Sequence, residues 1–324
     1  MVTIDIKDRK ILYQLLNNSR QPLSVIGKKV GLSRKVVGYR IKKLEDDGVI
    51  INYRTSINAT CLGLSLARFY YSLQFTSPEI KKEIIDFFAK SKCTNYVAEI
   101  EGSYDLEVGV FTYFYGSNDK FISFYDETQR RYRQYFDDQI GSIYNGVEVF
   151  DCVFLLGEKN LKPKSAVHSI KHPAKIDDID IKILHMLARN ARIPIVEIAK
   201  ELDTTVITVK NRIKKLTNEN VILRFMTIID WLKLGYRNFY IEINLKDYNN
   251  KYKIMNYVRN NPNLYGITHS IGYNIDLEFD FLLQNVTQLH DTIKDLSTEF
   301  PDSIKNFKYY SLQKIHKWIG LPQQ

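Results

Sequence analysis

The side chains best suited to chemistry are the cations at the start of one predicted helix. A short turn over residues 30–33 separates two amphipathic segments, which is typical of a helix-turn-helix. The amino-terminal end of the second helix in this motif faces the base edges of DNA. We therefore assign four residues to base contacts: Ser33, Arg34, Lys35 and Val36. Three more residues face outward on the same helix: Tyr39, Arg40 and Lys43. We assign the two cations of this group, Arg40 and Lys43, to phosphates.

The alternative interpretation is that these cations form only a solvated helix face. The distribution of charge favours the nucleic-acid interpretation, because residues 1–55 hold 12 basic and 5 acidic side chains whereas residues 56–157 hold 9 and 14. The whole chain carries 46 Lys and Arg against 37 Asp and Glu, a formal net charge of +9. A basic segment followed by an acidic one predicts double-stranded DNA as the partner of the first.

The chain contains an internal repeat. Residues 5–50 align without a gap to residues 177–222 after a shift of 172 positions, and residues 40–44 recur unchanged as residues 212–216. Weaker similarity continues beyond residue 50. The 324 residues therefore form one module of roughly 150 residues written twice.

The second copy of the recognition helix differs from the first at its start. Val206 and Ile207 stand where the first copy has Arg34 and Lys35. Two interpretations are open: the second helix contacts a thymine-rich half-site through apolar side chains, or it has become mostly structural. The polar residues of this copy that we assign to DNA are Thr205, Thr208, Asn211, Arg212 and Lys215.

Apolar periodicity predicts the elements that position these side chains. Spacings of three and four residues predict three short helices up to Gly48, and residues 49–53 are predicted to form a strand, which gives a winged helix-turn-helix. The following pattern predicts strands and helices in the order β-α-β-β-α-β, and each copy repeats it. The first copy's elements are strands at 69–75, 96–100, 106–112 and 147–155, with helices at 79–89 and 119–135.

The predicted fold class is α+β, with two winged helix-turn-helix domains alternating with two ferredoxin-like domains. The winged domains are predicted at residues 1–57 and 176–230, and the ferredoxin-like domains at 62–157 and 235–324. Residues 158–175 contain Pro163 and Pro173 and lack apolar periodicity, so we expect an exposed linker there.

Other classes of function lack support in the sequence. The three cysteines, Cys61, Cys93 and Cys152, form no C-x-x-C pair, and no phosphate-binding, dinucleotide-binding, zinc-protease or serine-hydrolase motif occurs. No apolar run is long enough to span a bilayer. We therefore expect a cytoplasmic protein without enzyme activity, catalytic residues, metal or cofactor.

Two features of each copy resemble one known family. They are the helix-turn-helix pattern and a Gly-x-x-Asp turn further along the chain. The pattern of residues 8–15, 26–33 and 37–50 is similar to the DNA-binding domain of Lrp/AsnC transcriptional regulators. The Gly-x-x-Asp step at Gly102 and Asp105, between two strands, resembles the same family's ligand-sensing domain. The second copy repeats both features.

This resemblance implies a DNA-binding transcriptional regulator modulated by an amino acid or a related small molecule. It also implies self-association through the sensing domains, so a fused duplicate supplies both halves of a pair in one chain. The residues that the resemblance places at the effector are Gly102, Ser103, Tyr104, Asp105, Gly272 and Asp276.

A second family shares this two-domain module. Siroheme decarboxylases also occur as tandem fusions and act on a tetrapyrrole instead of DNA. Their sensing-like domain carries a His-Asn-Tyr-x-Arg segment, whereas the comparable residues 268–274 here contain His269 but no arginine. A siroheme decarboxylase-like enzyme is therefore the alternative function.

Overall fold

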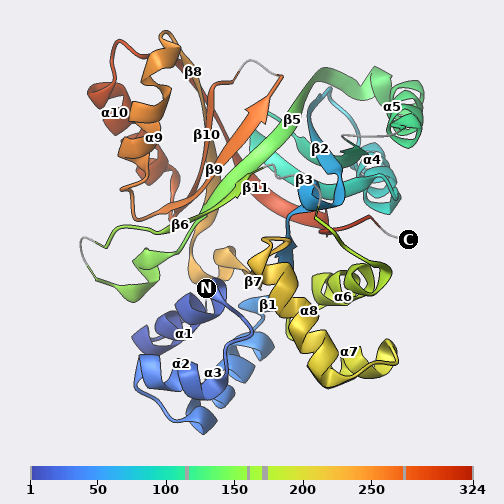
Figure 1. The fold of residues 1–324 in the computed structure, drawn as a ribbon. Helices are drawn as coiled ribbons and strands as arrows, with labels where there is room; N and C mark the ends of the chain where they lie inside the picture. Colours follow the sequence, from blue (N-terminus) through green and yellow to red (C-terminus); the bar gives the residue numbers. More distant parts are fainter. Residues whose placement is uncertain (1, 114–116, 159–160, 170–173, 273–274, 323–324) are drawn as a thin grey trace.

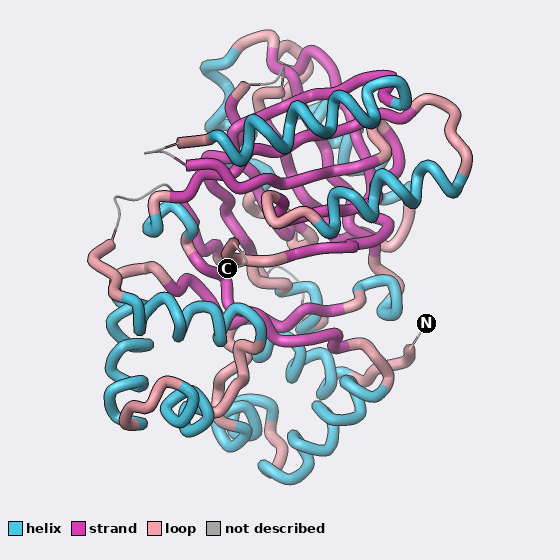
Figure 2. The backbone as a smooth tube through the Cα atoms, turned by 90° about the vertical axis from the view of Figure 1, so that its right-hand side faces the viewer, coloured by secondary structure: helices cyan, strands magenta, loops and turns pink. Residues whose placement is uncertain are grey.

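The computed structural model describes residues 2–113, 117–158, 161–169, 174–272 and 275–322. Both winged helix-turn-helix domains lie at one end of the molecule and the large β-sheet lies at the other (Figures 1 and 2). The predicted α+β fold class, with two winged domains and two β-α-β-β-α-β domains, is confirmed. Among the described residues, no helix has both the length and the apolar character needed to cross a membrane.

The two winged domains consist of equivalent elements with equivalent caps. Asp5 caps the first helix and Asp177 its counterpart, each in a capping box with an aspartate three residues later. Ser33 and Thr205 cap the two recognition helices. The first domain contains α1 (Ile6–Asn17), α2 (Leu23–Val30), α3 (Arg34–Asp46) and β1 (Ile50–Ile57), and the second contains α6 (Asp178–Arg189), α7 (Ile195–Glu201), α8 (Val206–Asn218) and β7 (Ile222–Ile229).

The helix-to-strand turn requires left-handed backbone in both copies. Gly48 has a φ of 65° after α3, and Asn220 has a φ of 58° after α8. Asparagine tolerates this conformation better than most residues because its short amide can hydrogen-bond locally. The replacement of glycine by asparagine in the second copy therefore leaves the turn intact.

Each sensing half has the predicted order of elements, and its helices cover the outer face of its strands (Figure 1). The first half contains β2 (Leu64–Leu73), α4 (Pro78–Lys90), β3 (Thr94–Gly102), β4 (Leu106–Tyr113), α5 (Asp119–Tyr132) and β5 (Phe136–Phe150). The second contains β8 (Arg237–Leu245), α9 (Lys251–Val258), β9 (Leu264–Ile271), β10 (Leu277–Leu283), α10 (Val286–Glu299) and β11 (Ile304–Trp318).

Two long strands join the halves into one sheet system. The first part of β5 pairs with β2 of its own half, and its last part pairs with β9 of the other half. Strand β11 does the same, pairing first with β8 and then with β3. The strand order β2-β4-β3-β11-β8-β10-β9-β5 closes through the additional β2–β5 pairing. Eight strands therefore form a closed ring with an interior between the two halves.

Three parts of this sheet system lie outside the strands that the sequence predicts. Strand β2 begins at Leu64, five residues before the predicted start at residue 69. Strand β5 begins at Phe136, eleven residues before the predicted start at residue 147. In its first part, Asp137, Asp138 and Gly141 are exposed and do not alternate regularly with buried apolar residues, so the apolar signal of a strand is weak. Strand β6 (Ser165–Ser169) pairs with β5 and lies within residues 158–175, which we expected to form an exposed linker.

Each winged domain buries its core partly against the other copy. The core of the first domain, around Ile11, Leu15 and Val37, includes Ile229 and Trp231 from the second copy. The core of the second domain includes Cys61 and partly buried Ile57 from the first copy. The two winged domains therefore complete each other's cores.

Candidate nucleic-acid interface and sensing-domain interior

The start of α3 presents its predicted base-contacting residues to solvent. Arg34, Lys35 and Val36 are exposed, and Tyr39 keeps 70% of its surface. The Ser33 hydroxyl accepts a hydrogen bond from the Val36 backbone N–H at 3.3 Å, so it caps the helix. Val37, Ile41 and Leu44 of the same helix are buried in the core of the domain, so the exposed residues are those that do not pack there.

Arg40, assigned to phosphate from the sequence, is held within its own domain. Its Nη1 lies 2.7 Å from an Asp5 carboxylate oxygen and 2.8 Å from one of Asp8. Hydrogen bonds to Asp8 and Asp5 raise the pKa of Arg40. This side chain ties α3 to the start of α1, whereas Lys43 is exposed further along α3.

The same ion pairs recur in the second winged domain. Arg212 Nη1 lies 2.7 Å from Asp177 and 2.8 Å from Asp180. Lys215 donates to the Lys175 carbonyl oxygen at 3.0 Å and lies 3.4 Å from Asp180. These two predicted DNA contacts therefore have structural partners. Asn211 is exposed on the same helix.

Helix α8 also carries exposed lysines that sequence reasoning missed. Lys210 and Lys214 are both exposed. Lys210 aligns with Gly38 of the first copy, so the repeat gives no signal for it, whereas Lys214 repeats Lys42 and could have been predicted. At the start of this helix, Val206 and Ile207 are 42% and 71% exposed.

The two winged domains, which carry the recognition helices, are joined by a shared two-stranded sheet. Strands β1 and β7 pair antiparallel, from Ile50 opposite Ile229 to Ile57 opposite Ile222. Thr55 donates its hydroxyl to the Leu187 carbonyl at 2.7 Å, and Thr227 donates in the equivalent way to Leu15 at 3.0 Å. These symmetry-related bonds fix α3 and α8 relative to each other.

The Gly-x-x-Asp turn of the first half lies where the two halves join. Ser103 donates through its backbone and its hydroxyl to the Tyr309 carbonyl of β11, at 3.1 and 2.9 Å. Tyr104 is buried in the interior, with its hydroxyl 3.1 Å from Glu242 Oε2. Asp105 accepts the Leu73 N–H at 2.8 Å.

The equivalent turn of the second half shows the same carboxylate contact. Asp276 accepts the Leu245 N–H at 2.7 Å, as Asp105 does in the first half. Gly272 lies beside Gly141 of β5. The intervening residues 273–274 lie outside the described part of the chain. Ser103 and Gly272 therefore lie at the seams between the halves, whereas Asp105 and Asp276 each accept a backbone N–H of their own half.

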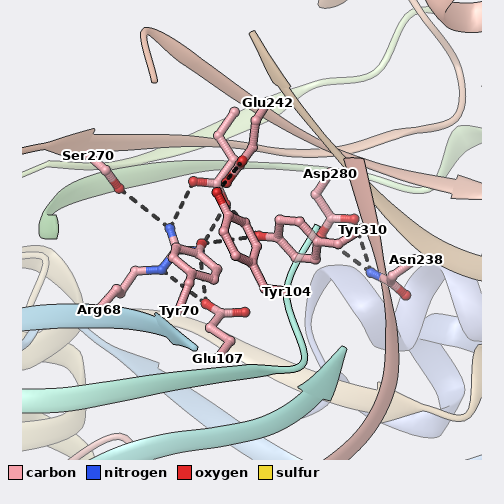
Figure 3. Close-up of polar contacts among 10 residues, drawn as sticks. Arg68, Tyr70, Tyr104, Glu107, Asn238, Glu242, Ser270, Asp280 and Tyr310 are labelled. Atoms are coloured by element: carbon pink, nitrogen blue, oxygen red, sulfur yellow. Dashed lines mark hydrogen bonds and ion pairs between the residues drawn. The ribbon is translucent and has the colours of Figure 1, made fainter. Parts of the chain in front are cut away.

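A buried ionic cluster occupies the interior between the sensing halves (Figure 3). Arg68 of β2 lies 2.8 Å from Glu107 of its own half and bonds both oxygens of Glu278 in the other half, at 2.9 and 3.0 Å. Tyr70 and Tyr310 hydroxyls lie 3.1 Å apart beside it. Burial opposes the charge of Arg68, but the two carboxylates outweigh this and raise its pKa.

The sequence contained a faint signal for this cluster. Arg68 is a single cation in a strand of mostly apolar residues, and Glu107 and Glu278 occupy matching positions in β4 and β10. The first copy's Arg68 corresponds to Asn238 in the second, which donates to Asp280 at 3.1 Å. Burial raises the pKa of Asp280. The cluster is therefore asymmetric between the halves.

A second ion cluster joins β5 to the other half. Glu148 lies 2.6 Å from Arg259 Nη2 at the end of α9 and 3.2 Å from His269 Nε2 on β9. Burial alone would raise the pKa of Glu148, but hydrogen bonds from His269 and Arg259 outweigh it and lower that pKa to about 2. His269 is therefore bound to a structural carboxylate. Among the described residues, no group of three or more His, Cys, Asp or Glu is arranged to hold a metal ion.

Comparison with known proteins gives sequence matches to both winged domains. The family of winged helix-turn-helix DNA-binding domains matches residues 4–51 and again residues 176–222. The proline dehydrogenase transcriptional activator of Rhodobacter capsulatus is 43% identical over 61 residues, which are 19% of this chain and 40% of that protein. The HTH-type transcriptional regulator FL11 of Pyrococcus horikoshii is 32% identical over 115 residues, 34% of this chain and 72% of that protein. The chain belongs to the Lrp/AsnC family.

The Lrp/AsnC-family chain also has a structural relative over almost its whole length. The crystal structure of the siroheme decarboxylase NirDL covers 98% of this chain and 94% of its own, with a TM-score of 0.64 and 12% sequence identity. At this identity the likeness concerns the fold. The chain spans about two fifths of the length of the proline dehydrogenase activator, so the sequence match there concerns the winged domain.

The Lrp/AsnC-type turn at Gly102 predicts a stability difference between two matched variants. Gly102 has a φ of 130°, and an added Cβ would lie 2.6 Å from the Tyr309 carbonyl oxygen of β11. Gly272 has a φ of 109°, but a Cβ added there would lie 3.9 Å from its nearest neighbour, the Gly141 carbonyl oxygen. Gly102→Ala should lower the free energy of unfolding by about 2 kcal/mol.

Denaturant unfolding of both variants measures this difference. Gly272→Ala should be the milder change, because it introduces the conformational strain without the close approach to another strand. Equal losses in the two variants would mean that the β3–β11 contact does not constrain Gly102.

Proposed function

We propose that this Lrp/AsnC-family chain is a transcriptional regulator that binds double-stranded DNA in a sequence-specific way. We propose that it acts in the cytoplasm. The observation that carries the proposal is the exposed Arg34 and Lys35 at the start of α3, on a helix fixed to its counterpart by the β1–β7 pairing. Long cations at this position suit the O6 and N7 acceptors of guanine. The named regulators among its relatives support the same function.

We further propose that an amino acid or a related small molecule modulates DNA binding. The proposed effector residues are Gly102, Ser103, Tyr104 and Asp105, with Gly272 and Asp276 in the second half. Because both turns lie at the seams between the halves, a ligand there would act on the pairing of β3 with β11 and of β9 with β5. One chain already holds one pair of halves, and sedimentation mass measures whether chains associate further.

The DNA-binding proposal is tested by selecting bound fragments from random DNA at near-physiological salt. Wild-type protein should enrich a motif, and Arg34→Ala should remove the preference at one position at a cost of about 1–3 kcal/mol. Lys43→Ala is the matched control: it should weaken binding to all sequences alike and lower the salt slope by about one. No motif from the wild-type protein would overturn the proposal.

The alternative function is decarboxylation of siroheme. It is supported by the similarity between the fold of this chain and that of the siroheme decarboxylase. A specific tetrapyrrole site would give this chain new visible absorbance after incubation with siroheme and desalting. We expect no retained absorbance, since His269 is bound to Glu148 and its strand contributes no arginine. Stoichiometric retention, together with absence of a DNA motif, would favour the enzyme.

A further inference from the structure

The start of α8 carries two large apolar side chains that do not enter its core. Val206 and Ile207 are 42% and 71% exposed, although Val209 and Leu216 of the same helix are fully buried. The Thr205 and Thr208 hydroxyls lie 2.9 Å from each other across this first turn. Its outward surface is therefore apolar, at the positions where α3 presents Arg34 and Lys35.

Resting on the proposed function, we infer that the two recognition helices contact different bases. Helix α3 contacts guanine through Arg34 and Lys35, and α8 contacts thymine through Val206 and Ile207. The C5 methyl of thymine is the apolar group that the major groove offers, and aliphatic side chains contact it. Neither Val206 nor Ile207 can bond to the polar edge of guanine. The preferred DNA site is therefore asymmetric, with a guanine-containing half and a thymine-containing half.

The surroundings of these two residues favour DNA over a purely structural role for α8. Lys210 and Lys214 are exposed along the same helix and supply positive charge for phosphates. Arg212 and Lys215 are already bound to Asp177 and Asp180, so they shape the domain. The β1–β7 pairing joins the two winged domains, so a DNA duplex that contacts both helices would meet them in a set geometry.

The experiment removes single methyl groups from the DNA. Full-length protein is first used to select a motif, and the half that depends on α8 is identified as the one altered in Val206→Ala/Ile207→Ala. Each thymine in that half is then replaced by deoxyuridine, which lacks only the C5 methyl. Binding should weaken about four-fold for each contacted methyl, which corresponds to about 0.8 kcal/mol.

A matched variant links the effect to the side chain. Ile207→Ala should bind thymine and deoxyuridine sites equally, at the position that Ile207 contacts. Ile122→Ala, which truncates an exposed isoleucine of α5, should keep the full four-fold preference. Deoxyuridine placed in the other half should affect the wild-type protein and Ile207→Ala alike.

Three results distinguish the two proposals. An asymmetric motif with a methyl effect that Ile207→Ala abolishes supports the inference. A palindromic motif, or an asymmetric motif without a methyl effect, overturns the inference and leaves the proposed function standing. Absence of any motif overturns both.

Discussion

Arg68→Met should lower the free energy of unfolding by about 3–5 kcal/mol. The substitution keeps most of the side-chain volume but removes the cation that lies between Glu107 and Glu278. Both carboxylates are more than nine-tenths buried, so they would remain in a medium of low polarity without a counter-charge. Denaturant unfolding at pH 7, followed by circular dichroism, measures the loss.

Two further variants separate the missing cation from a general loss of packing. Arg68→Met/Glu107→Gln/Glu278→Gln removes all three charges and should recover a large part of the lost stability. Arg130→Met changes an exposed arginine of α5 and should alter stability by less than about 0.5 kcal/mol. If the triple variant were less stable than Arg68→Met, the charges would not be the cause.

Glu148 should make the protein sensitive to acid. Its pKa is lowered from 4.5 to about 2 in the folded state, so its contribution is complete above the unfolded pKa and is lost as the pH falls from about 4.5 to about 2. We expect this contribution to be about 3 kcal/mol at pH 7. The stability difference between wild type and Glu148→Gln should therefore shrink by about this amount across that range.

Unfolding curves at pH 7, 4 and 2.5 measure the change. Arg259→Gln removes one of the groups that lower the pKa of Glu148 and should move the loss of stability to higher pH. Glu219→Gln, at an exposed position after α8, serves as the control for removing a carboxylate. A constant difference between wild type and Glu148→Gln at all three pH values would contradict the assignment.

Much of the fold could be predicted because it depends on local signals repeated in two copies. The three winged-domain helices follow from apolar spacing, and the β-α-β-β-α-β order follows from alternating periods. The first part of β5 escaped prediction because Asp137, Asp138 and Gly141 interrupt its pattern. Its pairing with β2, about 70 residues away in the sequence, fixes it as a strand.

The site residues could likewise be predicted only where they depend on one local element. Exposure of Arg34 and Lys35 follows from one helix, so periodicity could predict it. The pairing of Arg40 with Asp5 and Asp8 needs two helices to meet, and the sequence offered no signal for their distance. Arg68 and Glu278 are 210 residues apart, and their contact depends on how one half packs on the other.

The ring of strands closed by β5 and β11 affects how the protein behaves at low cellular concentration. A regulator assembled from separate subunits loses its paired form on dilution, because pairing depends on subunit concentration. Here the partner half is always present at the effective concentration set by the same polypeptide. The paired form therefore persists at a few copies per cell, and occupancy of a DNA site should rise in simple proportion to the amount of chain at low levels. Among the described residues, each of the eight ring strands already has a neighbour on both sides, so a half from a related protein could enter the ring only by displacing one of them.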